Sequence, residues 1–358
     1  MDLDKSHFGS SDNNEHADAE TIVIDGKLSV QANVTDLDLH SRNLEDISSL
    51  SKLKKLKALN LKHNRISDVS ALSGLSSLTE LKLDCNKTLD VSTLSGLSSL
   101  KTLSLSGTKI YDFSSLSRLG SLTTLDLPMS GISDISTLSG LTQLTGLDLY
   151  WNKISDISPL SKLSSLTWLN LRFNRLADID ISALSELSSL TWLDLYRNWI
   201  PSIPKFPRTL TSLNLSRNKL SDISALSELD SLTRLDLSSN KISDISALSG
   251  LTSLSSLNLC CNDISDISAL SGLTSLTDLR LTENKITDIT ALSGLTALSR
   301  LDLYGNEISD FSALAGLSPE IADVYIDEEN DISGLEKLAV SLFESVIPGQ
   351  TIFKEKKE

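Results

Sequence analysis

The chain has 358 residues, of which 47 are acidic and 32 basic, so its formal net charge at pH 7 is −15. A surface this acidic repels the phosphate backbone, so we expect no nucleic acid among its partners. No apolar run is long enough to cross a bilayer, and residues 1–20 lack the apolar core of a secretory signal. The composition therefore predicts a cytoplasmic chain without a membrane partner, or alternatively one exported by a route that needs no such signal.

The amino-terminal segment predicts an acidic tail followed by a small cap. Residues 1–20 are polar and acidic and have few apolar side chains to bury, so we expect them to be disordered. Asp25 and Gly26 form a two-residue turn signal between the apolar runs 21–24 and 27–30. We therefore expect a β-hairpin within residues 21–33 that covers the start of the repeats that follow.

A leucine pair with one residue between its members recurs from residue 34 to residue 318. The first leucine of the pair returns every 22 residues from Leu37 to Leu169 and again from Leu213 to Leu301, and Leu193 lies between these two runs. The alternation around each pair predicts a strand with one buried face. The thirteen repeats predict a solenoid, because a single repeat cannot bury its apolar face without stacking on its neighbours.

Two polar residues recur within the repeat. Most repeats have an asparagine three residues after the second leucine, and we expect its amide to bond to backbone groups left unpaired at the end of the strand, with breaks at Arg42, Thr108 and Ser130. An aspartate follows in most repeats, before a short segment whose apolar spacing fits neither a strand nor a full helix. We expect a 3₁₀ or irregular turn there, capped by the aspartate. A ladder of aspartates that binds cations is the alternative.

The string from Asn152 to Leu160, N-K-I-S-D-I-S-P-L, resembles the repeats of bacterial internalins. Over residues 34–318 the chain is similar to the 22-residue class of leucine-rich repeats, which also includes a regulatory subunit of protein phosphatase 1. This resemblance implies an α/β-type repeat solenoid of horseshoe shape, with a parallel β-sheet on the concave face and 3₁₀ or irregular turns on the convex face. It also implies two candidate roles, a phosphatase-regulatory subunit or an exported bacterial effector. Such families share scaffold residues and differ in binding residues, so the resemblance identifies no partner.

Repeats six to eight differ from the others on the strand side that points away from the core. Large aromatic and arginine side chains replace small polar residues there, and all four tryptophans of the chain lie in this stretch. These residue types are enriched at binding hot spots, so we predict a protein-binding patch on the concave face. The alternative is that the rings pack on one another and stiffen the sheet. The predicted binding residues are Asp148, Tyr150, Trp151, Trp168, Arg172, Phe173, Trp192, Asp194, Tyr196, Arg197 and Trp199.

The same stretch contains the departures from the regular repeat length. An insertion of two residues falls within 178–181, and the next repeat is shortened and contains Pro201, Pro204 and Pro207, which favour an extended path. We expect the curvature of the solenoid to change there.

The carboxyl-terminal segment, residues 319–358, predicts a last strand and a second cap. Residues 324–326 resemble a degenerate repeat strand. From Ser333 to Val346, a capping-box pair and apolar side chains at helical spacing predict an amphipathic helix that ends before Pro348. We expect this helix to cover the exposed end of the solenoid.

The sequence predicts no catalysis. The histidines (His7, His16, His40 and His63) have no catalytic or metal-binding spacing, and no phosphate-binding glycine loop is present. A metal site near His40 and His63 is an alternative to an ordinary solvated polar face. We therefore predict a monomeric, non-enzymatic module without cofactor or metal that recognises a protein partner. A structural scaffold subunit of a large assembly is the alternative function.

Overall fold

The computed structural model describes residues 20–110, 112–177, 179–317, 321 and 323–326. The predicted acidic tail, apart from Glu20, and the predicted carboxyl-terminal helix lie outside these residues. The chain divides into two compact units, which are described separately. The N-terminal unit comprises residues up to 132 and residues 136–152, and the C-terminal unit comprises residues 133–135 and residues from 153 onward.

The described chain begins with an antiparallel hairpin of β1 (Thr21–Ile24) and β2 (Leu28–Gln31). Ile24 pairs with Leu28, so the turn has three residues instead of the two expected, and Lys27 belongs to it. Asp25 and Gly26 adopt left-handed φ angles of 48° and 63°, which the Asp-Gly pair tolerates well. The buried face of β1 contacts the 3₁₀ helix η1 (Ser48–Lys52) of the first repeat.

The N-terminal unit continues with one short parallel strand in each repeat. Neighbouring strands pair in the order of the chain and in register, so that the first leucine of each pair lies opposite its equivalent, as Leu59 does with Leu81. The strands are β3 (Asp36–Asp38), β4 (Ala58–Asn60), β5 (Glu80–Lys82), β6 (Thr102–Ser104), β7 (Thr124–Asp126) and β8 (Gly146–Asp148).

The C-terminal unit repeats the same arrangement. Val324 lies opposite Leu301, so the predicted degenerate strand pairs like a regular one. The strands are β9 (Trp168–Asn170), β10 (Trp192–Asp194), β11 (Ser212–Asn214), β12 (Arg234–Asp236), β13 (Ser256–Asn258), β14 (Asp278–Arg280), β15 (Arg300–Asp302) and β16 (Asp323–Tyr325). The parallel strand pairing predicted from the leucine pairs is confirmed in both units.

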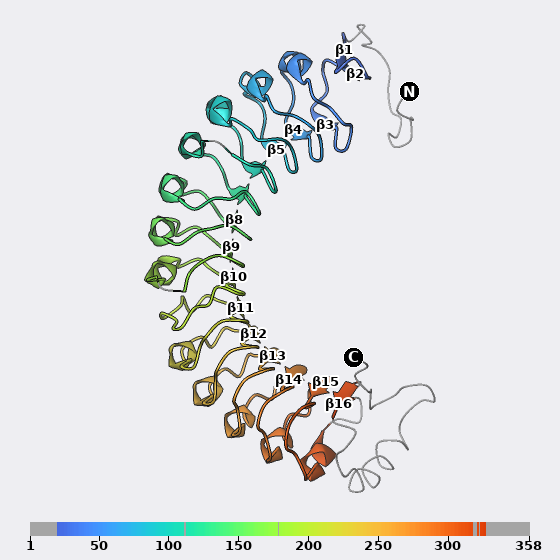
Figure 1. The fold of residues 1–358 in the computed structure, drawn as a ribbon. Coiled ribbons are helices and arrows are strands. Elements are labelled where there is room, and N and C mark those ends of the chain that lie inside the picture. Colours follow the sequence, from blue (N-terminus) through green and yellow to red (C-terminus); the bar gives the residue numbers. More distant parts are fainter. Residues whose placement is uncertain (1–19, 111, 178, 318–320, 322, 327–358) are drawn as a thin grey trace, which may run out of the picture. The chain divides into compact units, whose positions relative to one another are not determined.

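Short 3₁₀ helices form the other side of the repeats, as the sequence predicts. In each unit the strands line the inner side of the curve and the 3₁₀ helices line the outer side (Figure 1). None of the described helices is long and apolar enough to cross a membrane. Besides η1, the helices are η2 (Ser70–Leu72), η3 (Ser92–Gly96), η4 (Ser114–Arg118), η5 (Ser136–Gly140), η6 (Ser158–Lys162), η7 (Ser182–Glu186), η8 (Ser224–Leu226), η9 (Ser246–Leu248), η10 (Ser268–Leu270), η11 (Thr290–Leu292) and η12 (Ser312–Gly316).

The repeat that contains Pro201, Pro204 and Pro207 differs from its neighbours. Between β10 and β11, all of whose connecting residues are described, there is no 3₁₀ helix. Each proline lacks a backbone N–H, so the segment cannot close the hydrogen bonds of a 3₁₀ turn at these positions. Phe206 is buried there and supplies apolar contact in place of the usual helix leucine.

Each repeat contributes its leucines to a core that is almost closed to solvent. Leu169 and Leu171 of β9's repeat are 0% exposed, and so are Leu270 and Leu273 on the helix side of a later repeat. Burying one such side chain stabilises the folded state by about 1.5–3 kcal/mol. The strands are only three residues long, so this apolar stack, rather than sheet hydrogen bonding alone, holds the repeats together.

The predicted asparagine ladder is present. Asn262 is typical: its Nδ2 donates to the carbonyl oxygens of Leu237 and Leu259, both at 3.0 Å, and its Oδ1 accepts the N–H of Ile242 at 3.1 Å. One side chain therefore satisfies backbone groups of its own and of the preceding repeat. These groups would otherwise be buried without partners where the strand ends.

Two of the predicted breaks in the ladder are not breaks. The Thr108 hydroxyl donates to the carbonyl of Leu83 at 2.9 Å, and the Ser130 hydroxyl donates to the carbonyl of Leu105 at 3.1 Å. Both are buried and occupy the position of the asparagine. A hydroxyl can replace the amide as donor to the preceding repeat, so the expected interruption at these residues was wrong.

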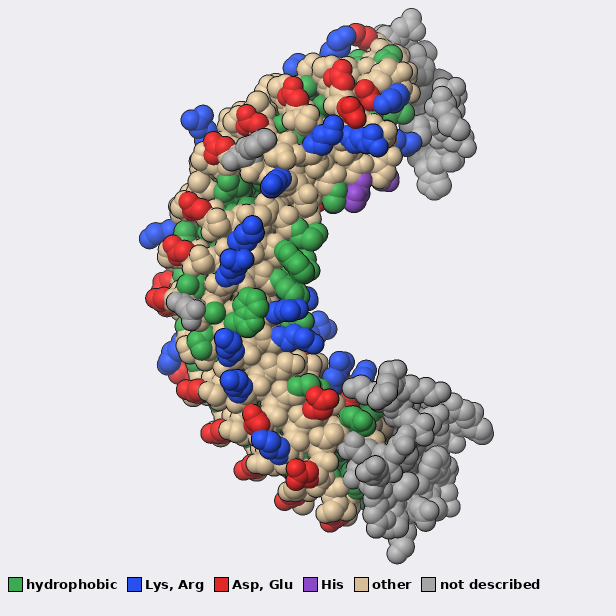
Figure 2. Space-filling model, in the orientation of Figure 1, with side chains coloured by type: hydrophobic (Ala, Val, Ile, Leu, Met, Phe, Trp, Pro, Cys, Tyr) green, Lys and Arg blue, Asp and Glu red, His purple; other side chains and the backbone are tan. Residues whose placement is uncertain are grey.

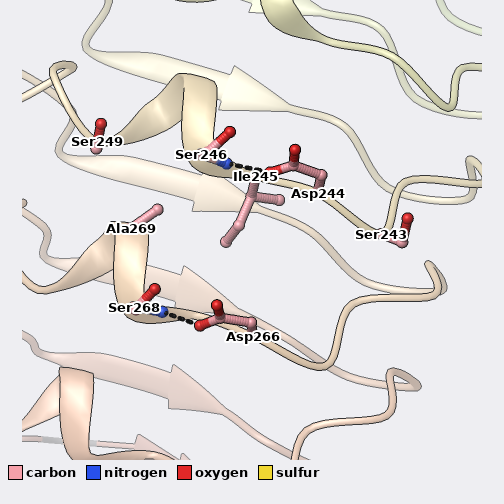
Figure 3. A pocket seen from close by; sticks show the side chains of 8 residues that line it. All are labelled: Ser243, Asp244, Ile245, Ser246, Ser249, Asp266, Ser268 and Ala269. Carbon is pink, nitrogen blue, oxygen red and sulfur yellow. Dashed lines mark hydrogen bonds between the residues drawn. The ribbon is translucent and has the colours of Figure 1, made fainter.

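The aspartate before each 3₁₀ helix accepts a backbone N–H two residues further on. In Figure 3, Asp244 and Asp266 accept the N–H groups of Ser246 and Ser268, each at 2.8 Å. The backbone N–H of Ser246, and then its hydroxyl, hold the pKa of Asp244 below its usual value of 3.8. Such a carboxylate favours the folded state above that pH, and its contribution is lost as the pH falls below it. The capping role predicted from the sequence is confirmed for these residues.

We predict that Asn262→Ala lowers the free energy of unfolding by about 1–3 kcal/mol, because it leaves buried backbone groups unsatisfied. Asn258→Ala, in the same repeat, removes a half-exposed amide on the strand and should cost less than about 1 kcal/mol. Urea-induced unfolding followed by circular dichroism measures both. Equal losses for the two variants would contradict the role assigned to the ladder.

Candidate functional site

The predicted binding residues fall into the two units. Asp148, Tyr150 and Trp151 belong to the N-terminal unit. The other eight belong to the C-terminal unit, and all of them except Asp194 form what we call the aromatic cluster: Trp168, Arg172, Phe173, Trp192, Tyr196, Arg197 and Trp199. Each group is described within its own unit.

Two tryptophans begin neighbouring strands of the C-terminal unit. Trp168 of β9 and Trp192 of β10 are paired in register, so they occupy equivalent positions on adjacent strands. Both are half-buried, whereas Leu169 and Leu193, the next residues along, are buried in the core. The strand alternation therefore turns the two indole rings away from the core, as the sequence predicts.

Four other members of the cluster, two aromatic residues and two arginines, contact one another through their rings and guanidinium groups. The ring centroids of Phe173 and Tyr196 are 5.1 Å apart. The Cζ of Arg172 lies 4.8 Å from the Tyr196 ring, and that of Arg197 lies 5.1 Å from the Phe173 ring. Contacts of this kind contribute about 0.5–1 kcal/mol each at exposed sites. The packing of aromatic side chains on one another, raised from the sequence as an alternative to binding, is thus present here.

Asp194 has a different role from the one predicted. The residue is 3% exposed, and its carboxylate accepts hydrogen bonds from the N–H of Tyr196 at 2.9 Å and from the Nδ2 of Asn214 at 3.2 Å. The Nη1 of Arg172 lies 3.6 Å from the same group. Burial raises the pKa of Asp194, although these partners oppose the shift. The carboxylate is therefore engaged inside the protein, where it holds Arg172 and the backbone beside Tyr196.

A left-handed bend follows the strand in every one of the thirteen repeats. The residue two positions after the second leucine has a positive φ throughout, and it is Gly107 and Gly305 in two repeats. Phe173 and Arg197 occupy this position with φ of 54° each. They lie at the bend, beyond Asn170 and Asp194, which are the last residues of the strands, so the expectation that they lie on the outward side of a strand was wrong.

Trp199 has a further left-handed conformation, with φ of 58°. Two other repeats adopt this conformation at the equivalent position, and they use Asn43 and Gly131. Asn and Gly tolerate positive φ, whereas a bulky residue is strained there by about 1–3 kcal/mol. Trp199 is nevertheless 45% exposed, so core packing does not account for its presence.

The N-terminal unit holds the smaller part of the predicted patch. Trp151 is 53% exposed, occupies the left-handed bend with φ of 52°, and lies edge-on to Tyr150 at 6.0 Å between ring centroids. The Asp148 carboxylate accepts the N–H of Tyr150 at 2.8 Å. Asp148 thus supports the bend, in the same way as Asp194 does in the other unit.

One carboxyl group that sequence reasoning missed lies on β7. In most repeats the residue between the two leucines accepts an N–H two residues on, but at Asp126 that position is Pro128, which has no N–H. Within the described part of the chain, no hydrogen bond reaches the Asp126 carboxyl. Burial, and then the charge of Asp148 opposite it, raise its pKa to about 6. The sequence Asp-Leu-Pro could have indicated this carboxyl, because proline stands where the other repeats supply the N–H donor.

No cluster of metal-binding side chains is found among the described residues, and the grooves between the 3₁₀ helices recur with the repeat. The described residues contain no group of three or more His, Cys, Asp or Glu side chains that could hold a metal ion. A groove of about 450 Å³ lies between η9 and η10, and Figure 3 shows the side chains that line it. Grooves of about 460 and 410 Å³ recur between neighbouring 3₁₀ helices, so they follow from the repeat itself.

Comparison with known proteins agrees with this geometry. Leucine-rich repeat models match residues 32–87 and 164–206, and a model of two such repeats matches residues 208–250, 230–272, 252–294 and 274–316. An internalin, inlF of Listeria monocytogenes, is 36% identical with a TM-score of 0.78, over 85% of this chain and 90% of that one. The chain is an internalin-like leucine-rich repeat protein.

More distant leucine-rich repeat structures share the fold. A protein of Leptospira interrogans is 23% identical with a TM-score of 0.63, over 90% of this chain and 96% of that one. The ectodomain of the Arabidopsis thaliana receptor kinase GASSHO1/SCHENGEN3 is 24% identical with a TM-score of 0.65, over 89% of this chain and 47% of that one. None of the curated protein sequences matches the chain.

We predict that Asp126→Asn stabilises this leucine-rich repeat protein at neutral pH. The folded-state pKa of about 6 exceeds the usual 3.8, so the native carboxyl weakens stability as the pH rises from about 4 to 6. The side chain is partly open to solvent, so we expect a gain of about 1 kcal/mol at pH 7 and little change at pH 3.5. Thermal unfolding across this pH range measures it.

Asp236→Asn serves as the control, because the Asp236 carboxylate accepts the N–H of Ser238 at 2.9 Å and should yield no gain. Pro128→Ala restores the missing N–H and should lower the pKa of Asp126 in an NMR titration. An unchanged titration in Pro128→Ala would show that the missing donor is not the cause.

Proposed function

We propose that this protein is a non-enzymatic recognition module that binds a protein partner on the strand side of its C-terminal unit, centred on the aromatic cluster. The observation that carries the proposal is the exposure of a bulky side chain in a left-handed conformation. Trp199 is 45% exposed and has a backbone conformation that Gly or Asn would adopt at lower cost. Core packing does not require this ring, so a contact outside the chain is the better explanation for it.

The cluster is also pre-organised for binding. Arg172 is held between the buried Asp194 carboxylate and the Tyr196 ring, and Arg197 lies against Phe173. Side chains that are already ordered lose less conformational entropy on association, which costs about 0.5–1.5 kcal/mol for each flexible side chain. Trp, Tyr and Arg are the residue types that dominate binding hot spots.

Related folds support a protein or peptide as the occupant. The GASSHO1/SCHENGEN3 ectodomain is in complex with Casparian Strip Integrity Factor 2, and the plant receptor RGFR1 is in complex with the peptide hormone RGF2. These receptors are 24% and 21% identical to the chain, so they bear on what the scaffold can hold and not on which residues bind. The residues of the site are inferred from this chain's own geometry.

We predict that the double variant Trp168→Ala, Trp192→Ala loses its partner with little loss of stability. Truncating an interface tryptophan commonly costs about 2 kcal/mol or more, roughly a thirtyfold loss of affinity. Both rings point away from the core, so the free energy of unfolding should change by less than about 1 kcal/mol. Leu169→Ala, which truncates a fully buried side chain, should cost about 2–5 kcal/mol in stability.

Affinity capture with the wild-type chain and quantitative mass spectrometry identify the partner, and titration calorimetry with the purified partner gives the affinities. Met129→Ala, which truncates an exposed apolar side chain of the N-terminal unit, is the control for non-specific loss of apolar surface. Unchanged affinity together with a large drop in stability would show that the cluster is structural.

A further inference from the structure

Basic side chains follow one another along the bends of the C-terminal unit. After strands β9 to β12, five exposed Lys and Arg residues occupy the positions on either side of the ladder asparagine. No acidic residue occupies these positions in the four repeats, although the whole chain carries a charge of −15. We call this set the basic edge: Arg175, Arg197, Arg217, Lys219 and Lys241.

The charges of the basic edge are not balanced inside the protein. Among the described residues, Arg175, Arg217, Lys219 and Lys241 form no ion pair, and the guanidinium of Arg197 lies over the Phe173 ring. The later repeats differ, because Lys285 pairs with Asp263 there. Opposite charges are therefore supplied at the equivalent positions of the later repeats and are lacking at the basic edge.

The strand carboxylates nearest to the basic edge form hydrogen bonds within the protein. Asp236 accepts the N–H of Ser238 at 2.9 Å and the Nδ2 of Asn258 at 3.3 Å, and Asp194 is buried among its own partners. The aspartates of the other side, such as Asp244, bond to the starts of the 3₁₀ helices. Figure 2 shows acidic side chains mainly on the side that carries the 3₁₀ helices, and Lys and Arg beside hydrophobic side chains on the strand side.

We propose that the basic edge, together with the aromatic cluster, binds an acidic segment of the partner protein. This inference rests on the proposed function and specifies the chemistry of its partner. Arg197 belongs to both surfaces, so a partner that covers the rings also meets the free charges. Neighbouring strands are about 4.8 Å apart, so an extended peptide that crosses them brings successive carboxylates within reach of successive basic groups.

The charge distribution favours a short acidic protein segment over nucleic acid. At physiological ionic strength, charges more than about 8 Å apart are largely screened from each other. A short segment bound at the basic edge is therefore attracted by these basic groups and is little repelled by the acidic residues elsewhere on the chain. A long polyanion would also meet the acidic remainder of a chain with a charge of −15. Binding of a protein segment by its carboxylates and its apolar side chains uses both surfaces at once.

The test uses a short fluorescent peptide of alternating Glu and Leu, with a matched peptide of alternating Lys and Leu. Fluorescence anisotropy with the full chain should show tighter binding of the acidic peptide, weakening as salt is raised. The variant Arg217→Glu, Lys219→Glu, Lys241→Glu should bind it at least about tenfold more weakly, because three attractive contacts become repulsive. Thermal melts verify that the variant folds.

A matched control reverses three charges on the 3₁₀ helices: Lys52→Glu, Arg118→Glu, Lys162→Glu. It changes the net charge by the same amount, so it should leave the acidic peptide's affinity within about threefold of the wild-type value. Equal losses in the two triple variants would mean that net charge alone governs binding, and this would overturn the inference.

Two further outcomes separate this inference from the proposed function. If the acidic peptide binds no better than the basic one, or if a short DNA duplex binds more tightly with the same sensitivity to charge reversal, the inference fails while the aromatic cluster stays open to partner binding. If charge reversal abolishes binding of the acidic peptide but Trp168→Ala, Trp192→Ala has no effect, the basic edge stands and the role of the cluster fails.

Discussion

The side chain at the end of each strand has to satisfy backbone groups that the fold buries there. A strand of three residues cannot continue its ladder around the bend, and the leucines on either side exclude water from the carbonyl groups. The asparagine amide donates to its own repeat and to the preceding one, while its oxygen accepts an N–H of the preceding repeat. The stacking of the leucines and the hydrogen bonds of the asparagine depend on each other, because displacing one repeat would disrupt both.

The same bend decides where functional side chains can lie. A left-handed residue at that point lets the chain leave the sheet, and its side chain then lies at the edge of the strand side, where it makes no core contact. Most repeats place small or polar residues there, but Phe173 and Arg197 use it to reach Tyr196 and one another. A binding surface can therefore change at the bends while the scaffold that positions it stays constant.

The residue between the two leucines is partly or fully buried in most repeats, and its hydrogen-bond partners decide the consequence of that burial. Asp194 stabilises the bend and lies beside Arg172, so the cluster depends on a residue that is itself only 3% exposed. Asp126 shows the opposite case, since Pro128 removes the N–H that would have compensated its burial. A carboxylate at this position is therefore tolerated when a backbone N–H donates to it. When that donor is absent, burial of the carboxylate lowers the stability of the folded state.

The sequence by itself determined the strands, their parallel register, the 3₁₀ turns and the asparagine ladder. Each of these depends on residues one repeat apart and recurs along the chain, so a pattern in the residue types reveals it. The sequence also singled out the aromatic residues, because they depart from the repeat pattern. The tertiary structure alone decided which groups they meet. Whether a hydroxyl such as that of Thr108 replaces an amide, whether Asp194 faces solvent, and whether Trp199 takes a left-handed bend depend on distances and backbone angles set by the neighbouring repeats, and residue types do not encode these separately.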